Sequence, residues 1–156
     1  MHLHSSVILV CGDFNVMKDF YLKVLGFEMV NDFGTCIALN NGLSLWKPAD
    51  NHPISPYVSK KVGSSFELCL ETSRDDEFDS MVSRILSHAP KLLHDVRVES
   101  WGQKTIRFFD PEDNLIEYGE AIPTFVKRMS KEGLSASEIA QKTGVPLGQV
   151  EGMLQP

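Results

Sequence analysis

Hydrophobic and polar positions in the first third of the chain predict one strand, one helix and three further strands. An apolar, β-branched run at residues 3–11 predicts a buried strand, which Gly12 and Asp13 end. Asn15 is the expected cap of the helix that follows, and Gly26 lies just past its last turn. The helical spacing is carried by Val16, Phe20, Leu22, Val24 and Leu25. Three short strands are then expected at residues 27–31, 35–39 and 43–46.

The same order of elements recurs after a loop at residues 48–63 that contains three prolines. Expected strands lie at 65–71, 92–99, 105–109 and 115–118, and an amphipathic helix lies at 75–88 with Phe78, Met81, Val82, Ile85 and Leu86 on one stripe. A repeated order of this kind indicates internal duplication. Neither half can cover both faces of its sheet, so the halves must share a core or pair with another subunit. The expected fold class is α+β, with two βαβββ modules at residues 3–47 and 64–120.

Residues 123–156 have a different pattern and are expected to form a helical extension to a domain of residues 1–122. Ser135 and Glu138 have the spacing of a capping box, and Gly144 closes the helix that they begin. The apolar spacing is that of a helix-turn-helix core, carried by Leu134, Ile139, Ala140, Val145 and Val150. The segment after Gly144 has no lysine or arginine, so it lacks the phosphate contacts of a DNA reader. A packing or oligomer contact is therefore favoured over nucleic-acid binding.

Composition and charge narrow the partners further. The chain has 156 residues and a formal net charge of −6, which suits a neutral or cationic ligand better than a polyanion. Three cysteines, Cys11, Cys36 and Cys69, are far apart and favour free thiols in a reducing compartment. Neither a secretory signal pattern nor an apolar run of membrane-spanning length is visible. We expect a cytoplasmic protein without a membrane partner.

Two motifs resemble a known superfamily. The helix segment 20–27 reads F-Y-L-K-V-L-G-F, and the last-strand segment 110–117 reads D-P-E-D-N-L-I-E. Both resemble signatures of the glyoxalase, bleomycin-resistance and extradiol-dioxygenase proteins, the vicinal oxygen chelate superfamily. The resemblance covers residues 3–120 and implies a curved sheet that forms a cup. Asp113 stands where the family usually has glycine, so this turn is expected to differ in shape.

The resemblance also implies four metal-ligand positions, of which the chain fills one well. The last-strand position matches Glu117, and the other three fall on Ser6, Ser44 and Ser65. Serine hydroxyls are poor ligands for a divalent first-row ion. No cofactor is therefore predicted. A shifted divalent-metal site that uses His4, Glu67 and Glu117 stays an alternative, because His4 and Glu67 lie two residues from Ser6 and Ser65.

Glu117 has several interpretations that the sequence leaves open. It could act as a catalytic base with a raised pKa, bind a cationic ligand, or form a structural ion pair with Arg107 on the preceding strand. Trp46, Trp101 and Tyr118 are candidates for aromatic pocket walls, with core or dimer packing as the alternative. The expected ligand pocket therefore contains Trp46, Trp101, Arg107, Tyr118, Ser6, Ser44 and Ser65.

The favoured function is small-molecule binding by a homodimer without an assigned reaction, since the resemblance implies that paired halves or subunits complete the cup. The alternatives are a metal-dependent lyase, isomerase or dioxygenase of the same superfamily, and a regulator that uses the C-terminal helices. Nucleotide-binding glycine loops and hydrolase or zinc-protease motifs are absent from the sequence.

Overall fold

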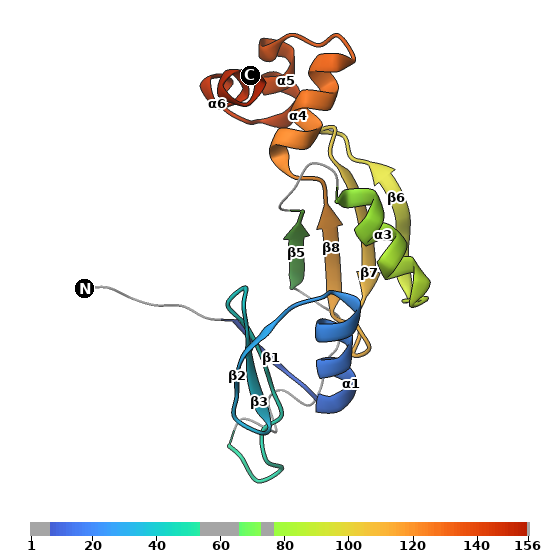
Figure 1. Cartoon of the computed structure of the whole chain (residues 1–156), viewed down its shortest axis with the longest axis vertical. Coiled ribbons are helices and arrows are strands. Elements are labelled where there is room, and N and C mark those ends of the chain that lie inside the picture. Colours follow the sequence, from blue (N-terminus) through green and yellow to red (C-terminus); the bar gives the residue numbers. More distant parts are fainter. Residues whose placement is uncertain (1–6, 54–65, 73–76, 156) are drawn as a thin grey trace, which may run out of the picture. The chain divides into compact units, whose positions relative to one another are not determined.

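The computed structural model describes residues 7–53, 66–72 and 77–155 (Figure 1). The chain divides into two compact units. Unit 1 comprises Met1–Phe66 and Phe109–Asn114, and unit 2 comprises Glu67–Phe108 and Leu115–Pro156. Each unit contains one module of the predicted duplication.

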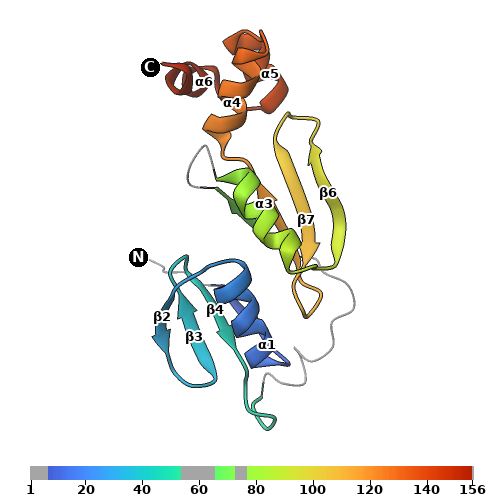
Figure 2. The same ribbon diagram turned by 45° about the vertical axis from the view of Figure 1, so that its right-hand side comes forward.

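Unit 1 contains the first strand, helix, strand, strand, strand sequence. Its elements are β1 (Val7–Val10), α1 (Phe14–Asp19), η1 (Phe20–Val24), β2 (Met29–Asp32), β3 (Cys36–Leu39) and β4 (Leu43–Trp46). The sheet order is β1-β4-β3-β2, with β1 parallel to β4 and the other neighbours antiparallel. Figure 2 shows α1 lying along one side of this sheet. The buried residues Leu9, Ile37, Leu39, Leu43 and Leu45 form that covered face.

The helix of unit 1 differs in detail from the expectation. Asp13, and not Asn15, is the cap, and its carboxylate accepts a hydrogen bond from the backbone N–H of Val16. The buried stripe is Met17, Phe20, Tyr21, Val24 and Leu25, whereas Val16 is exposed. These buried positions have the ordinary helical spacing of i, i+3, i+4, i+7 and i+8, and the expected stripe differs from them because it placed Val16 in the core instead of its neighbour Met17.

Unit 2 repeats the arrangement with a longer helix. Its elements are β5 (Glu67–Glu71), α3 (Phe78–Ser87), β6 (Leu92–Val98), β7 (Lys104–Phe109) and β8 (Leu115–Gly119). The sheet order is β5-β8-β7-β6, with β5 parallel to β8 and β6 antiparallel to β7. Helix α3 covers one face of this sheet (Figure 2). Its residues Phe78, Val82 and Ile85 are buried, as are Ile106, Phe108 and Ile116 of the strands.

The turn at residues 110–114 keeps a left-handed residue at the position where the family usually has glycine. Asp113 adopts a φ of 60°, a conformation that aspartate tolerates better than most residues. Asp110 holds the turn together, because its carboxylate accepts from the backbone N–H groups of Glu112 and Asn114. The Glu112 carboxylate accepts from the backbone N–H groups of Gly12 and Asp13 at 2.7 Å each. The turn is thereby fixed to the start of α1 within unit 1.

The C-terminal residues form three helices with their own small core. These are α4 (Ile122–Lys131), α5 (Ala136–Thr143) and α6 (Leu147–Leu154). The predicted capping box of Ser135 and Glu138 is present, and Gly144 ends α5 with a φ of 76°. All five predicted core positions pack with Phe125, Val126 and Met129. The predicted C-terminal helices are therefore confirmed, while their helix-turn-helix likeness and the domain boundary at residue 122 stay predictions.

Helix α4 is attached to the rest of unit 2 by polar contacts. The Arg128 side chain donates to the Gly102 carbonyl at 2.7 Å and to the Glu120 carboxylate at 2.8 Å. Glu120 in turn accepts from the backbone N–H of Lys104 at the start of β7. The helical extension thus belongs to the same compact unit as the second module.

The predicted α+β order of two βαβββ modules is confirmed. His4, Ser6 and Ser65 lie outside the described residues. In the described part of the chain, no helix has the length and apolar character needed to cross a membrane.

Candidate functional site

Each sheet leaves one face uncovered by its own helix, and the two faces differ in chemistry. On unit 1 the uncovered face carries mainly apolar side chains, because the strand register aligns Ile8, Val10, Cys36, Ala38, Ser44 and Trp46. On unit 2 the corresponding face is charged, because Glu67, Cys69 and Glu71 of β5 alternate with the residues that face α3. We call the uncovered face of the unit 2 sheet the charged face.

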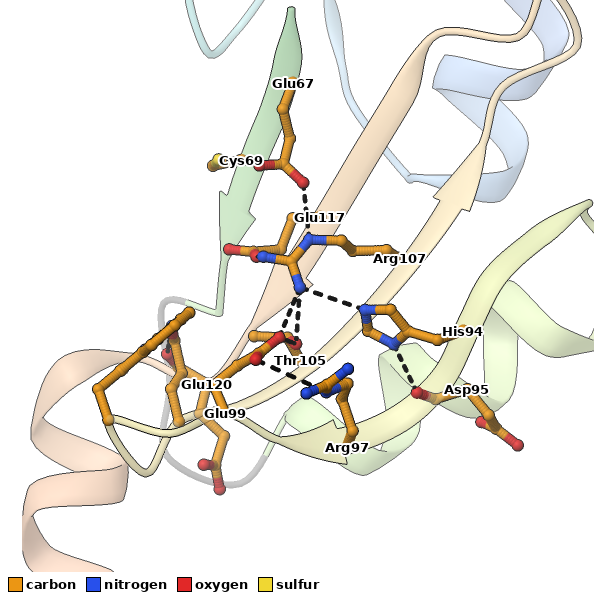
Figure 3. Close-up of polar contacts among 12 residues, drawn as sticks. Glu67, Cys69, His94, Asp95, Arg97, Glu99, Thr105, Arg107, Glu117 and Glu120 are labelled. Atoms are coloured by element: carbon orange, nitrogen blue, oxygen red, sulfur yellow. Dashed lines mark hydrogen bonds and ion pairs between the residues drawn. The ribbon is translucent and has the colours of Figure 1, made fainter.

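Five side chains on the charged face form a group that we call the Arg107 cluster (Figure 3). Arg107 Nε donates to Glu67 Oε1 at 2.8 Å, and Nη1 donates to Glu99 Oε1 at 2.5 Å. Nη2 donates to Glu117. His94 Nε2 lies 3.2 Å from Nη1. One guanidinium thus bridges three carboxylates that come from β5, the end of β6 and β8.

The strand pairing explains why these residues meet. Arg107 is aligned with His94 across the β6–β7 pair, and Thr105 is aligned with Arg97. Thr105 lies two residues before Arg107, so both side chains point to the same face of β7. Thr105 Oγ1 donates to Glu99 Oε1 at 2.8 Å. The β6–β7 hairpin thereby places Glu99 beside the guanidinium.

The charges in the cluster do not balance. Arg97 Nε lies 3.6 Å from Glu99 Oε2, and its side chain is 58% exposed. Among the described residues of the cluster and its edge, three carboxylates face two guanidinium groups when all three carboxylates are counted as ionised and histidine as neutral. The charged face therefore keeps an excess negative charge, which agrees in sign with the whole chain's formal charge of −6.

Two carboxylates of the cluster have pKa values shifted in opposite directions. Burial raises the pKa of Glu117, and the negative charges of Glu67 and Glu99 add to the rise, although Arg107 opposes it. Burial also acts against ionisation of Glu99, yet hydrogen bonds from Arg107 and Thr105 hold its pKa below the ordinary value. The protein environment therefore disfavours the charge of Glu117 and favours that of Glu99.

The other predicted pocket residues that the structure describes lie on different elements. Ser44 and Trp46 lie on the uncovered face of unit 1, where the Trp46 ring contacts His52 edge-on with a centroid distance of 5.0 Å. Trp101 lies in the turn between β6 and β7, and its indole N–H donates to Gln103. Tyr118 lies on the opposite face of β8 from Glu117, stacked on Phe78 in the core. Tyr118 therefore does not line the charged face, and its alternative interpretation as core packing fits its position.

Of the predicted residues, the structure brings together Glu67, Arg107 and Glu117. The ion pair between Arg107 and Glu117 is confirmed. Neither Glu99 nor His94 was among the predicted site residues. One signal was available: Arg97 and Glu99 are two charged residues that lie two positions apart at the end of β6, the strand that pairs with the segment of Thr105 and Arg107.

The residues of the charged face do not fit a divalent metal in their present arrangement. Glu117 and Glu67 accept hydrogen bonds from Arg107, so their oxygen atoms face a guanidinium. On unit 1, Ser44 presents only a hydroxyl, a poor ligand for such ions. Over the described ranges of the chain, His, Cys, Asp and Glu side chains form no group of three or more with metal-holding geometry.

Comparison with known proteins identifies the family behind this geometry. The model of the glyoxalase-like domain matches residues 4–123, which is most of the chain and includes both modules. The chain belongs to the glyoxalase-like family. This membership confirms the resemblance to the vicinal oxygen chelate superfamily that the two motifs carried. No curated protein matches the chain.

Solved structures support the fold. A protein of unknown function from Agrobacterium tumefaciens is similar with a TM-score of 0.65 and 23% identity, over 78% of this chain and 97% of that one. A glyoxalase/bleomycin resistance protein/dioxygenase family enzyme from Burkholderia phytofirmans has a TM-score of 0.65 and 18% identity, over 76% and 98%. A lactoylglutathione lyase from Agrobacterium tumefaciens has a TM-score of 0.58 and 22% identity, over 76% and 93%. The TM-scores show a shared fold, and at these identities they show the fold alone.

Proposed function

We propose that this glyoxalase-like protein binds a small organic cation on the charged face of unit 2, without a metal ion in the site. The observation that carries the proposal is the excess of carboxylates over guanidinium groups around Arg107. A ligand that brings one positive charge and N–H donors would compensate that excess. Glu67 is the most accessible of the three carboxylates, with 31% of its side chain exposed.

Glu117 is the expected hydrogen-bond partner of such a ligand. Burial raises the pKa of Glu117, so a nearby cation would favour the ionised carboxylate. The ionised carboxylate would in turn attract the cation. The same property would suit a general base, so a reaction at this carboxylate is the second candidate. A metal-dependent lyase, isomerase or dioxygenase would need carboxylate oxygens that Arg107 already occupies.

Two further features bear on the proposal, namely the exposed apolar residues of β1 and the composition of helix α6. Val7 and Ile8 on the outer strand β1 are each 48% exposed, and a second copy of the chain would cover such apolar side chains in a homodimer. Helix α6 carries Glu151 as its one charged residue and has no basic side chain. This composition supports a packing role for the helical extension and not a regulator that reads DNA.

The test uses benzamidine as a cationic probe and benzamide as its neutral counterpart. We expect benzamidine to shift the backbone amide NMR signals of Glu67, Cys69 and Gly119, which lie on or beside the charged face, and benzamide to leave them unchanged. Equal shifts with both probes, or shifts confined to other parts of the chain, would refute the proposal.

A pair of charge-matched variants separates the local site from the net charge. Glu67→Gln removes one negative charge from the charged face, and Glu28→Gln removes one from an exposed position on unit 1. We expect benzamidine to bind several-fold more weakly to Glu67→Gln and with unchanged affinity to Glu28→Gln. Equal weakening in both variants would mean that only the overall charge attracts the probe.

A further inference from the structure

The three carboxylates and the imidazole of the Arg107 cluster form the kind of donor set that divalent first-row metal ions use in proteins. Glu67, Glu99 and Glu117 approach from three separate segments and all converge on the Arg107 side chain. His94 completes the set from β6. The present geometry nevertheless differs from a metal site, because the convergence point holds a guanidinium group.

Arg107 is firmly held at that point. All three nitrogens of its guanidinium donate hydrogen bonds, and its side chain is only 18% exposed. Burial opposes its charge, yet the hydrogen bonds to Glu67 and Glu99 raise the pKa of Arg107 above its already high ordinary value. The cation therefore persists at every pH at which the protein is folded.

A guanidinium and a divalent ion cannot share this position. Each carboxylate oxygen that accepts from Arg107 would have to turn away from it in order to ligate a metal. The positive charge that remained would also repel the incoming ion at close range. We infer that Arg107 is a built-in cation that takes the place of a divalent metal among Glu67, Glu99 and Glu117, so that its removal would create a metal site.

The test titrates purified, chelator-treated protein with Mn²⁺ alone and follows free Mn²⁺ by electron paramagnetic resonance. We expect the wild-type chain to leave the added Mn²⁺ free. We expect Arg107→Leu to bind about one equivalent, with an affinity at least about a hundredfold above that of the wild type, because removal of the guanidinium removes a close repulsion. Tight binding of Mn²⁺ by the wild type that is lost on Glu117→Gln would overturn the inference.

Two further variants distinguish the lost charge from a general disturbance. Arg107→Lys keeps a cation at the position and should bind Mn²⁺ no better than the wild type does. The double variant Arg107→Leu, Glu117→Gln should lose the affinity that Arg107→Leu gains. Binding by Arg107→Leu that Glu117→Gln does not reduce would mean that the ion lies elsewhere, and would also overturn the inference.

The outcome is decisive even if Arg107→Leu folds poorly without metal. In that case, Mn²⁺ should restore the native circular dichroism of Arg107→Leu and should not restore that of the double variant. Failure of Mn²⁺ either to bind a folded Arg107→Leu or to restore an unfolded one would contradict the inference. The result is independent of the proposed organic-cation site, because that site is tested on wild-type protein with a metal-free probe.

Discussion

Replacement of Arg107 by leucine should destabilise unit 2 in a manner that depends on pH. The substitution removes hydrogen bonds to three carboxylates and leaves those groups facing one another. Loss of one partner from a buried ion pair costs about 3–5 kcal/mol. Glu67 is partly exposed and can regain water, so we expect a loss of about 3 kcal/mol near pH 8.

The pH dependence follows from the carboxylates that remain. Without the guanidinium, their mutual repulsion raises their folded-state pKa values above those of the unfolded chain. A raised pKa gives stability that is present below the unfolded pKa and is lost as the pH rises through the folded pKa. The cost of Arg107→Leu should therefore be smaller at pH 5 than at pH 8. We expect a difference of at least about 1 kcal/mol, because a tenfold change in the proton affinity of one carboxylate corresponds to about 1.4 kcal/mol.

The assay is urea unfolding at pH 5 and pH 8, followed by the fluorescence of Trp101 in a Trp46→Phe background. Trp101 belongs to unit 2, so its signal reports the unit that is perturbed. Arg97→Leu is the control, because Arg97 is mostly exposed and makes a longer contact with Glu99, so it should cost below about 1 kcal/mol. An equal cost for Arg107→Leu at both pH values would refute the electrostatic reasoning.

Three further predictions concern the same unit. At neutral pH, Glu99→Gln should destabilise more than Glu117→Gln in urea unfolding, because the fold lowers the pKa of Glu99 and raises that of Glu117. In the wild type, the contribution of Glu117 to stability is accordingly lost as pH rises through its raised pKa. The contribution of Glu99 to stability is lost as pH falls through its lowered pKa. A larger destabilisation by Glu117→Gln than by Glu99→Gln would contradict this assignment. Gly102→Ala should cost about 1–3 kcal/mol more stability than Gly133→Ala. The φ angle is near +100° at both positions, but of the two only Gly102 would place a Cβ in overlap with the buried Met129 side chain. Equal thermal unfolding of the two variants would show that this contact is unimportant. A gel-shift with genomic DNA fragments at moderate salt should show no complex, and a salt-sensitive complex would contradict a packing role for α6.

A helix or strand could be predicted from the sequence wherever a turn or breaker residue marks each of its two ends. The strand β4 matches its predicted bounds, because a turn at residues 40–42 precedes it and a proline follows shortly after it. The buried stripe of the first helix follows the 3.6-residue period, but the adjacent apolar residues Val16 and Met17 both fit the start of that pattern, and the prediction chose Val16. Met17 and Tyr21 are buried in the core, whereas Val16 lies at the surface. Burial of Tyr21 is compensated by its hydrogen bond to Asp110, more than eighty residues away.

The candidate site could be predicted only in part. Glu117 and Arg107 were found because both lie near the last-strand motif, and their ion pair needs only the neighbouring strands β7 and β8. Glu99 and His94 depend on the register of β6 against β7, which shifts twice along the pair. Register shifts of this kind redirect side chains without a reliable sequence signal, so the positions of the third carboxylate and the imidazole could not be predicted from the sequence.

The carboxylate cage around Arg107 can be probed in solution without any substitution or ligand. An ¹⁵N NMR spectrum of the arginine Nε–H groups can compare Arg107 with the exposed Arg97 in the same molecule. We expect a sharp Arg107 signal whose Nε–H exchanges slowly with water, because Glu67 accepts its hydrogen bond and the group is largely buried. Exchange as rapid as that of Arg97 would show that no carboxylate cage holds the guanidinium, and both the cation site and the metal-replacement inference would then lose their basis.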